Sequence, residues 1–216
     1  MSILSTPVGA MAGVLVAPLV GGTSAQGDWS MGQANSAIPS GDYVSAGLQL
    51  VLPDPAFPNM VIGATVQTTW PHMRREITHN WYVDRRNPTV GFVNRDEAAI
   101  LYNTALRFAG RPCLEIGCWR GWSTAHIALA SGGLDVIDPV LADGAFLVDV
   151  MASLDRAGIL ACTVLHSGAS PEEVQAIAER TGKRWAFIFI DGNHEGDGPL
   201  NDATMAARYE IGRAHV

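Results

Sequence analysis

Short apolar runs alternate with segments of helical spacing over the second half of the chain. Runs that predict strands cover residues 113–116, 134–138, 160–165 and 185–190. Segments that predict helices cover residues 94–108, 122–130 and 146–157, a stretch beginning at residue 170, and residues 201–209. Strands that alternate with helices are typical of a parallel sheet covered by helices on both faces. The predicted fold class is therefore α/β, with a doubly wound, mostly parallel, Rossmann-like sheet of about four strands.

The first 73 residues follow a different pattern. β-prone runs at residues 48–52 and 61–66 alternate with proline-rich turns, and neither lysine nor arginine occurs before Arg74. We expect residues 1–73 to form an irregular, partly β extension whose first 40 residues are poorly ordered. Residues 74–93 are predicted to be a linker whose arginines favour a solvated seam over a clamp for an anionic substrate. Residues 94–209 then form the Rossmann-like domain.

Composition and charge narrow the class of protein. Of the 216 residues, 48% are hydrophobic and 16% are charged, which is too apolar for a disordered chain. A formal net charge of -7 argues against nucleic acid as a partner. No stretch of about 18 apolar residues free of glycine and proline predicts a membrane span. Three cysteines without a CxxC pair, and an apolar start without the basic residues of an export signal, favour a cytoplasmic protein.

The turn after the first of these strands is one candidate for a ligand site. It has the sequence EIGCWRGWS over residues 115–123, where Gly117 permits a sharp turn and Gly121 permits close approach to the next helix. A dinucleotide fingerprint would need glycine at positions 119 and 122, and both are tryptophan, which disfavours a pyrophosphate cradle. Asp138 ends the next strand, 21 residues after Gly117, where a carboxylate can accept hydrogen bonds from ribose hydroxyls. The combination favours a nucleoside ligand; the alternative is a tight turn followed by a carboxylate that caps the next helix.

The end of the fourth predicted strand is the other candidate. Asp191 follows the apolar run 185–190, so its carboxylate is expected at the same edge of the sheet as Gly117 and Asp138. It can ligate Mg²⁺ or orient a substrate hydroxyl, and His194 can accept a proton from that hydroxyl. The alternatives are that Asp191 caps the loop after the strand and that His194 is a surface histidine.

Two of these segments resemble a known family. Residues 115–123 resemble motif I, ExGxxxGxS, of class I S-adenosylmethionine-dependent methyltransferases. Residues 187–196, FIFIDGNHEG, resemble the DGDHxYEG signature of the methyltransferase-24 type, which is similar to macrocin and sugar O-methyltransferases. The resemblance covers residues 90–209. It implies S-adenosylmethionine as cofactor, Mg²⁺ as an optional metal, and methyl transfer to a hydroxyl of a sugar or another small molecule, which is the expected partner.

The resemblance also implies roles for single residues. Six would contact the cofactor: Glu115, Gly117, Gly121 and Ser123 on the methionine and ribose side, Asp138 at the ribose hydroxyls, and Ser167 near the adenine. The turn after Ser167 lacks the acid of the family's version. Asp191 and His194 would be the catalytic residues, with Asp191 also the candidate metal ligand. Asn193 stands where metal-dependent relatives carry an acidic base, which leaves His194 for that role.

Class I methyltransferases have more strands than this chain predicts, so the resemblance implies truncation at the C-terminus. Residues 185–190 would then form an open apolar edge that favours self-association; the alternative is that an N-terminal β-run fills this edge. Residues 210–216 are expected to be a non-native tail. The alternative functions are a nucleotide-dependent oxidoreductase, a truncated non-catalytic fragment that binds cofactor, and a carbohydrate-associated module led by residues 1–73.

Overall fold

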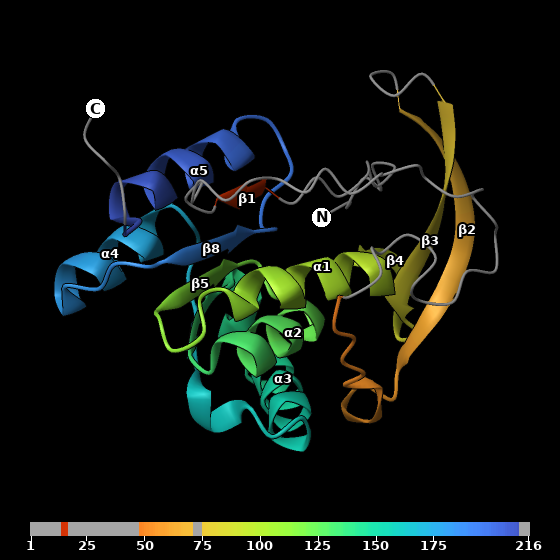
Figure 1. The fold of residues 1–216 in the computed structure, drawn as a ribbon, viewed down its shortest axis with the longest axis horizontal. Coiled ribbons are helices and arrows are strands. Elements are labelled where there is room, and N and C mark those ends of the chain that lie inside the picture. Colours follow the sequence, from red (N-terminus) through yellow and green to blue (C-terminus); the bar gives the residue numbers. More distant parts are fainter. Residues whose placement is uncertain (1–13, 17–47, 71–74, 212–216) are drawn as a thin grey trace.

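A mostly parallel β-sheet lies at the centre of the molecule. The computed structural model describes residues 14–16, 48–70 and 75–211, and Figure 1 shows this sheet between two layers of helices. The strand order is β1-β8-β5-β6-β7. Its members are β1 (Val14–Val16), β5 (Cys113–Ile116), β6 (Leu134–Ile137), β7 (Thr163–His166) and β8 (Phe187–Ile190). All are parallel except β1, which confirms the predicted α/β fold.

Some of the strands are shorter than the apolar runs that predict them. The run at residues 160–165 begins with a short 3-10 helix, η3 (Leu160–Cys162), before β7 starts. Trp185 lies outside β8 because its N–H donates to Tyr209 O at 3.0 Å, near the end of the last helix. Every residue of β5, β6 and β8 is buried, as strands covered on both faces must be.

Five helices surround this sheet within the described residues, and side chains cap the starts of the first and the third. The five are α1 (Arg95–Leu106), α2 (Trp122–Ser131), α3 (Gly144–Arg156), α4 (Glu172–Thr181) and α5 (Gly198–Tyr209). Asn94 and Glu97 cap α1 reciprocally: Asn94 Oδ1 accepts from Glu97 N–H at 2.9 Å, and Glu97 Oε2 accepts from Asn94 N–H at 2.8 Å. The predicted start of this helix at Asn94 is thereby confirmed.

Two apolar clusters hold the helices on the two faces of the sheet. Phe187 and Phe189 of β8 belong to a cluster with residues of α1, α2 and α3. Ile188 and Ile190, which point the other way because side chains alternate along a strand, belong to a cluster with residues of α4 and α5. The sheet is therefore doubly wound, with the glycine turn after β5 and the loop after β8 at one edge.

The segment predicted as a linker, residues 74–93, instead forms most of a second sheet. This sheet has the order β2-β3-β4 and consists of β2 (Met60–Trp70), β3 (Arg75–Asp84) and β4 (Asn87–Phe92). β2 and β3 pair in antiparallel register from Met60↔Asp84 to Trp70↔Arg75 and extend away from the helices in Figure 1. The prediction missed β3 because its charged residues masked the β-branched and aromatic residues between them.

The open edge predicted for the fourth strand is covered over three residues. Val14, Leu15 and Val16 pair with Ile190, Phe189 and Ile188 in an antiparallel register. An N-terminal segment thus fills this edge, as in the alternative prediction, but it is not one of the predicted β-runs. Residues 48–52 form no strand, and residues 61–66 belong to β2 (Met60–Trp70) of another sheet. Self-association stays a prediction, but its premise of an open edge is not met at these residues. The disorder expected for the first 40 residues concerns a stretch that, apart from residues 14–16, lies outside the described ones.

The stretch expected to be a non-native tail begins inside the fold. Ile211 N–H donates to Trp185 O at 2.8 Å, and Glu210 forms a parallel bridge with Trp185. Residues 212–216 lie outside the described part of the chain.

Trp122 joins the two sheets. Its side chain is fully buried, its Nε1 donates to Val93 O at 3.0 Å, and its ring stacks on Tyr82 of β3 with 5.8 Å between centroids. Phe57, which follows the short helix η1 (Asp54–Ala56), packs edge-on against the same ring at 5.4 Å. This aromatic contact fixes the base of the antiparallel sheet against α2.

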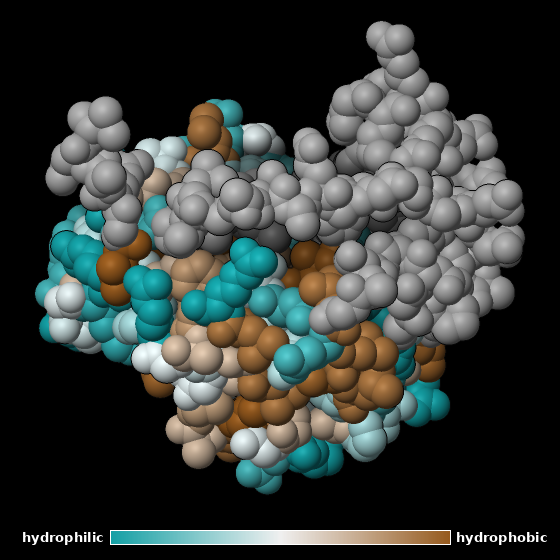
Figure 2. Space-filling model, viewed as in Figure 1, coloured by the Kyte–Doolittle hydropathy of each residue, from teal (hydrophilic) through white to brown (hydrophobic). Residues whose placement is uncertain are grey.

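Some apolar surface stays exposed on the face drawn in Figure 2. It gathers over α1, α2 and the segment before η1, where Leu50, Leu52 and Leu129 are exposed. Among the described residues, no helix combines the length and the apolar character that a membrane crossing needs.

We expect His126 to make the fold sensitive to acid. It is 2% exposed beside Trp122, and burial lowers its pKa from 6.5 to about 4. Because the folded-state pKa is depressed, the unfolded chain binds more protons between these values, so stability falls as the pH drops from 6.5 to 4. The loss attributable to this group is about 3 kcal/mol at most.

The variant His126→Asn keeps an N–H donor for Trp122 O and removes the titrating ring. Urea unfolding as a function of pH should show a shallower loss of stability for the variant over this window. Equal slopes for the two proteins would contradict the assignment.

Candidate functional site

The turn after β5 touches the tip of β8. Gly117 has a φ of 87°, and a Cβ atom there would lie 2.3 Å from Asp191 O. The Gly117 N–H donates to Ile137 O at 2.8 Å, and the Asp191 N–H donates to Ile116 O at 2.8 Å. The ends of β5, β6 and β8 are thus held together, which places Gly117, Asp138 and Asp191 at one edge of the sheet, as predicted from the sequence.

Gly121 has a different structural reason from the one predicted. It precedes α2 with a φ of 85°, and a Cβ there would lie 3.4–3.5 Å from the side chains of Leu154 and Val150 on α3. These are ordinary van der Waals distances, so the positive φ, rather than a close approach, favours glycine here. Its predicted contact with a cofactor stays a prediction.

Asp138 holds the glycine turn through its carboxylate. Its Oδ2 accepts from the N–H groups of Cys118 at 2.8 Å and Trp119 at 2.9 Å, while its Oδ1 accepts from Val140 N–H at 2.9 Å. The last bond caps the 3-10 helix η2 (Pro139–Ala142), so the capping alternative is realised. A carboxylate has about four acceptor positions. One is left for a ligand, and a pair of ribose hydroxyls would displace a backbone N–H.

Glu115 binds the start of α2 from inside the core. It is fully buried, and its two oxygens accept hydrogen bonds from Ser123 Oγ and Thr124 Oγ1, each at 2.5 Å. The pKa of Glu115 is raised to about 8. Burial is the main cause, the charges of Asp191 and Asp138 add to it, and the two hydrogen bonds oppose it. The predicted residues Glu115 and Ser123 thus bind each other and fix the first turn of α2. Thr124 was missed, although a hydroxyl in the first turn of the helix was visible in the sequence.

Asp191 and His194 form an ion pair in the loop after β8. Asp191 Oδ1 lies 3.2 Å from His194 Nε2, and the two side chains are 12% and 45% exposed. Contact with Asp191 raises the pKa of His194 above 6.5, while partial burial opposes the shift. The imidazole is therefore accessible and oriented by a carboxylate, which is the arrangement of a general base. Ser167 is exposed after β7, at the same edge of the sheet.

Nothing among the described residues near Asp191 supports a magnesium ion. No group of three or more His, Cys, Asp or Glu side chains that could hold a metal occurs among the described residues. Asp191 faces His194, and Asn193 Oδ1 accepts from Glu195 N–H at 2.9 Å. Neither Mg²⁺ nor the role of Asp191 as a metal ligand is supported, and no chemical step is assigned to a metal.

The same residues fit a nucleoside that carries an amino-acid chain. Asp191 Oδ1 is buried and makes no hydrogen bond to the described residues besides its ion pair with His194. Trp119 Nε1 is likewise buried without a hydrogen-bond partner among the described atoms. A carboxylate suits an ammonium group and the remaining acceptor position of Asp138 suits a hydroxyl, so the donors and acceptors match such a ligand.

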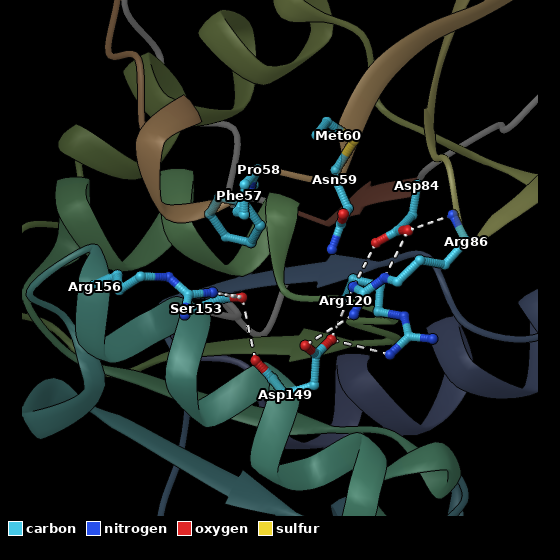
Figure 3. Close-up of a pocket in the computed structure, with 10 residues that line it drawn as sticks. All are labelled: Phe57, Pro58, Asn59, Met60, Asp84, Arg86, Arg120, Asp149, Ser153 and Arg156. Atoms are coloured by element: carbon cyan, nitrogen blue, oxygen red, sulfur yellow. Dashed lines mark hydrogen bonds and ion pairs between the residues drawn. The ribbon is translucent and has the colours of Figure 1, made fainter.

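A polar hollow lies beside the glycine turn and was not predicted. Figure 3 shows it between η1, the start of β2, the end of β3 and α3, with Arg120 of the glycine turn reaching into it. Asp84 and Arg86 line it from the antiparallel sheet, and Asp149 lines it from α3. Neither Gly117 nor Asp138 borders it.

A family model matches the part of the chain that contains the glycine turn and the loop after β8. Residues 114–210 match the family model described as a methyltransferase domain, which confirms the resemblance drawn from residues 115–123 and 187–196. No protein with a curated description matches the chain.

Solved structures with similarity to the chain include three bacterial methyltransferases. The O-methyltransferase TomG from Streptomyces achromogenes, described in complex with SAM, is 23% identical over 55% of this chain and 52% of its own, with a TM-score of 0.48. The O-methyltransferase from Bacillus cereus, in complex with SAH, is 19% identical over 55% and 53%, with a TM-score of 0.48. A SAM-dependent methyltransferase from Agrobacterium tumefaciens is 14% identical over 73% and 52%, with a TM-score of 0.46. The chain spans about half the length of these proteins.

We expect Gly117→Ala to be much more destabilising than an alanine at another glycine with positive φ. At Gly132, which ends α2 with a φ of 74°, a Cβ meets nothing within 4 Å. There the cost is the backbone strain of about 1–2 kcal/mol. At Gly117 the methyl group must also displace the backbone of Asp191, which should bring the loss to at least about 3 kcal/mol.

Chemical denaturation of Gly117→Ala and Gly132→Ala measures both losses. Similar losses for the two variants would show that the contact with Asp191 does not constrain the turn.

Proposed function

We propose that residues 114–210, which belong to the methyltransferase domain family, bind S-adenosylmethionine where β5, β6 and β8 end, and that this chain transfers the methyl group to a hydroxyl. The acceptor class is a sugar or another small molecule. The observation that carries the proposal is the meeting of the Gly117 turn, Asp138 and the Asp191–His194 pair at one edge of the sheet. Ligands of doubly wound sheets bind at that edge.

Four side chains hold the cofactor in the proposal. Asp138 accepts a ribose hydroxyl through its remaining acceptor position. Asp191, whose backbone lies against the glycine turn, accepts a hydrogen bond from the ammonium group of the methionine part. Ser123, anchored on the buried Glu115, lies on the methionine side, and Ser167 lies on the adenine side.

His194 accepts the proton in the proposed reaction. S-adenosylmethionine supplies a methyl group activated by a positively charged sulfur. The hydroxyl oxygen of the acceptor forms the new bond to the methyl carbon as the carbon–sulfur bond breaks, and the hydroxyl proton moves to His194 Nδ1, the ring nitrogen that does not face Asp191. Nδ1 is unprotonated only when the ring is neutral. The contact of Nε2 with Asp191 raises the pKa of His194, so Nδ1 becomes free to accept a proton at a higher pH than in an isolated histidine. In-line positioning of the two reactants supplies much of the rate.

Binding of S-adenosylmethionine should depend on Asp138. We expect Asp138→Asn to weaken binding at least about tenfold, a loss of about 1.4 kcal/mol, because the amide cannot accept from the turn and the ligand as the carboxylate does. The matched control is Asp143→Asn, because Asp143 also accepts from two backbone N–H groups but caps α3. Isothermal titration calorimetry measures both affinities.

A titration with NAD in the same experiment tests the oxidoreductase alternative. Binding of NAD in place of S-adenosylmethionine would overturn the proposal. Binding of S-adenosylmethionine without turnover of any sugar or phenol acceptor would favour the non-catalytic fragment.

The ion pair should be visible in the titration of His194. We expect the NMR signal of its imidazole C2 proton to titrate with a midpoint above 6.5, because Asp191 favours the charged ring. Asp191→Asn should lower the midpoint. The control is Asp197→Asn, which removes an exposed charge from the same loop. The Asp197 side chain makes no capping hydrogen bond to α5, so the midpoint should stay nearly unchanged. An equal shift in both variants would mean that the general field of the loop, rather than Asp191, sets the pKa.

A further inference from the structure

A chain of four charged side chains connects the antiparallel sheet to the glycine turn. Arg86 Nη1 and Nη2 donate to the two oxygens of Asp149 at 3.0 and 2.9 Å, and Arg120 Nη1 donates to Asp149 Oδ2 at 3.0 Å. At the other end, Arg86 Nε and Nη2 donate to Asp84 at 2.9 and 2.6 Å. Figure 3 shows these groups side by side along the hollow. Asp149 is therefore the residue at which the two arginines meet.

The geometry of this network of four charged side chains differs from that of an ordinary surface ion pair. Arg86 binds Asp149 with two parallel hydrogen bonds, and the side chains of Arg120 and Asp84 are only 17% and 4% exposed. Hydrogen bonds from Arg86 lower the pKa of Asp149 against the effect of burial. Isolated exposed pairs contribute little to stability, whereas bidentate pairs within a network are the exception.

Arg120, the last of the four charged residues, belongs to the glycine turn. The Arg120 guanidinium lies 3.9 Å from the centre of the Phe146 ring, and the Trp119 ring packs on the same phenylalanine at 4.9 Å. Trp119 has a positive φ of 43°, unusual for a residue other than glycine. This conformation presents its N–H to Asp138. Arg120 is the next residue, so the place of its side chain constrains the backbone that Asp138 holds.

We propose that Asp149 is a positioning residue for the cofactor turn: it holds Arg120 in place and, through Arg86, makes the position of the Cys118 and Trp119 N–H groups depend on the antiparallel sheet. As far as cofactor affinity is concerned, this inference rests on the proposed function. It assigns the antiparallel sheet a part in the site, through Asp84 and Arg86. Asp149 itself touches no reacting group.

Hydrogen exchange without ligand tests the positioning directly. In Asp149→Asn, the peptide that covers residues 117–121 should exchange roughly tenfold faster than in the unaltered protein, because the turn loses one of its two anchors. The matched control is Asp155→Asn, which removes an exposed charge from the same helix and should leave this peptide unchanged. Asp149→Glu keeps the charge and should restore most of the protection. The peptide around Asp135, a buried carboxylate on β6, monitors global stability.

Calorimetry on the same variants tests the link to the cofactor. We expect Asp149→Asn to weaken binding of S-adenosylmethionine roughly tenfold and Asp155→Asn to leave it unchanged. Faster exchange confined to residues 117–121 together with weaker binding supports the proposal. Unchanged exchange in the turn, faster exchange everywhere, or faster exchange with unchanged affinity would each overturn it. If the unaltered protein binds no S-adenosylmethionine, the proposed function fails, and the exchange data alone decide whether Asp149 positions the turn.

Discussion

The close contact between Gly117 and Asp191 is the constraint on which the rest of the site depends. No side chain fits there, because a Cβ atom would lie 2.3 Å from the Asp191 carbonyl oxygen. This contact allows the turn after β5 to bend across the ends of β6 and β8. Once it does, the N–H groups of Cys118 and Trp119 point at Asp138, and the backbone of Asp191 lies against the same turn. The polar groups of three strands become one site through the absence of a single side chain.

The three carboxylates of the site are kept apart in function by what each one accepts. Glu115 accepts from hydroxyl groups in the core, Asp138 from backbone N–H groups and Asp191 from a half-exposed imidazole. Only Asp191 has a partner that can move, because the other two are bonded to the start of α2 and to the turn. The mutual repulsion of these groups appears at Glu115, whose pKa is raised mainly by burial and further by the other two carboxylates. Of the three carboxylates, Asp191 and the last acceptor position of Asp138 are therefore the groups that can bind a ligand.

The sequence was sufficient for the parallel sheet and for the meeting of Gly117, Asp138 and Asp191 at one of its edges, since both have local signatures. Buried strands appear as apolar runs, and ligand-binding residues follow directly after them. The strands β3 and β4 were missed because half-exposed antiparallel strands mix charged with β-prone residues. The link from Arg86 to Asp149 spans 63 positions, and no periodicity reports a contact of that kind. The convergence of His166, Lys183 and Trp185 on the buried Asp135 escaped prediction for the same reason.

The antiparallel sheet is attached to the parallel one by two contacts of different physical kinds. Stacking of Tyr82 on Trp122 is apolar, and Trp122 is fully buried. The contact therefore stabilises the fold but tolerates small sliding movements. The bidentate pair of Arg86 and Asp149 is directional, so it fixes one geometry. An apolar contact alone would leave the β3–β4 turn free to shift by fractions of an ångström relative to α3. The charged contact removes that freedom at the one point where a residue of the glycine turn, Arg120, shares the same carboxylate.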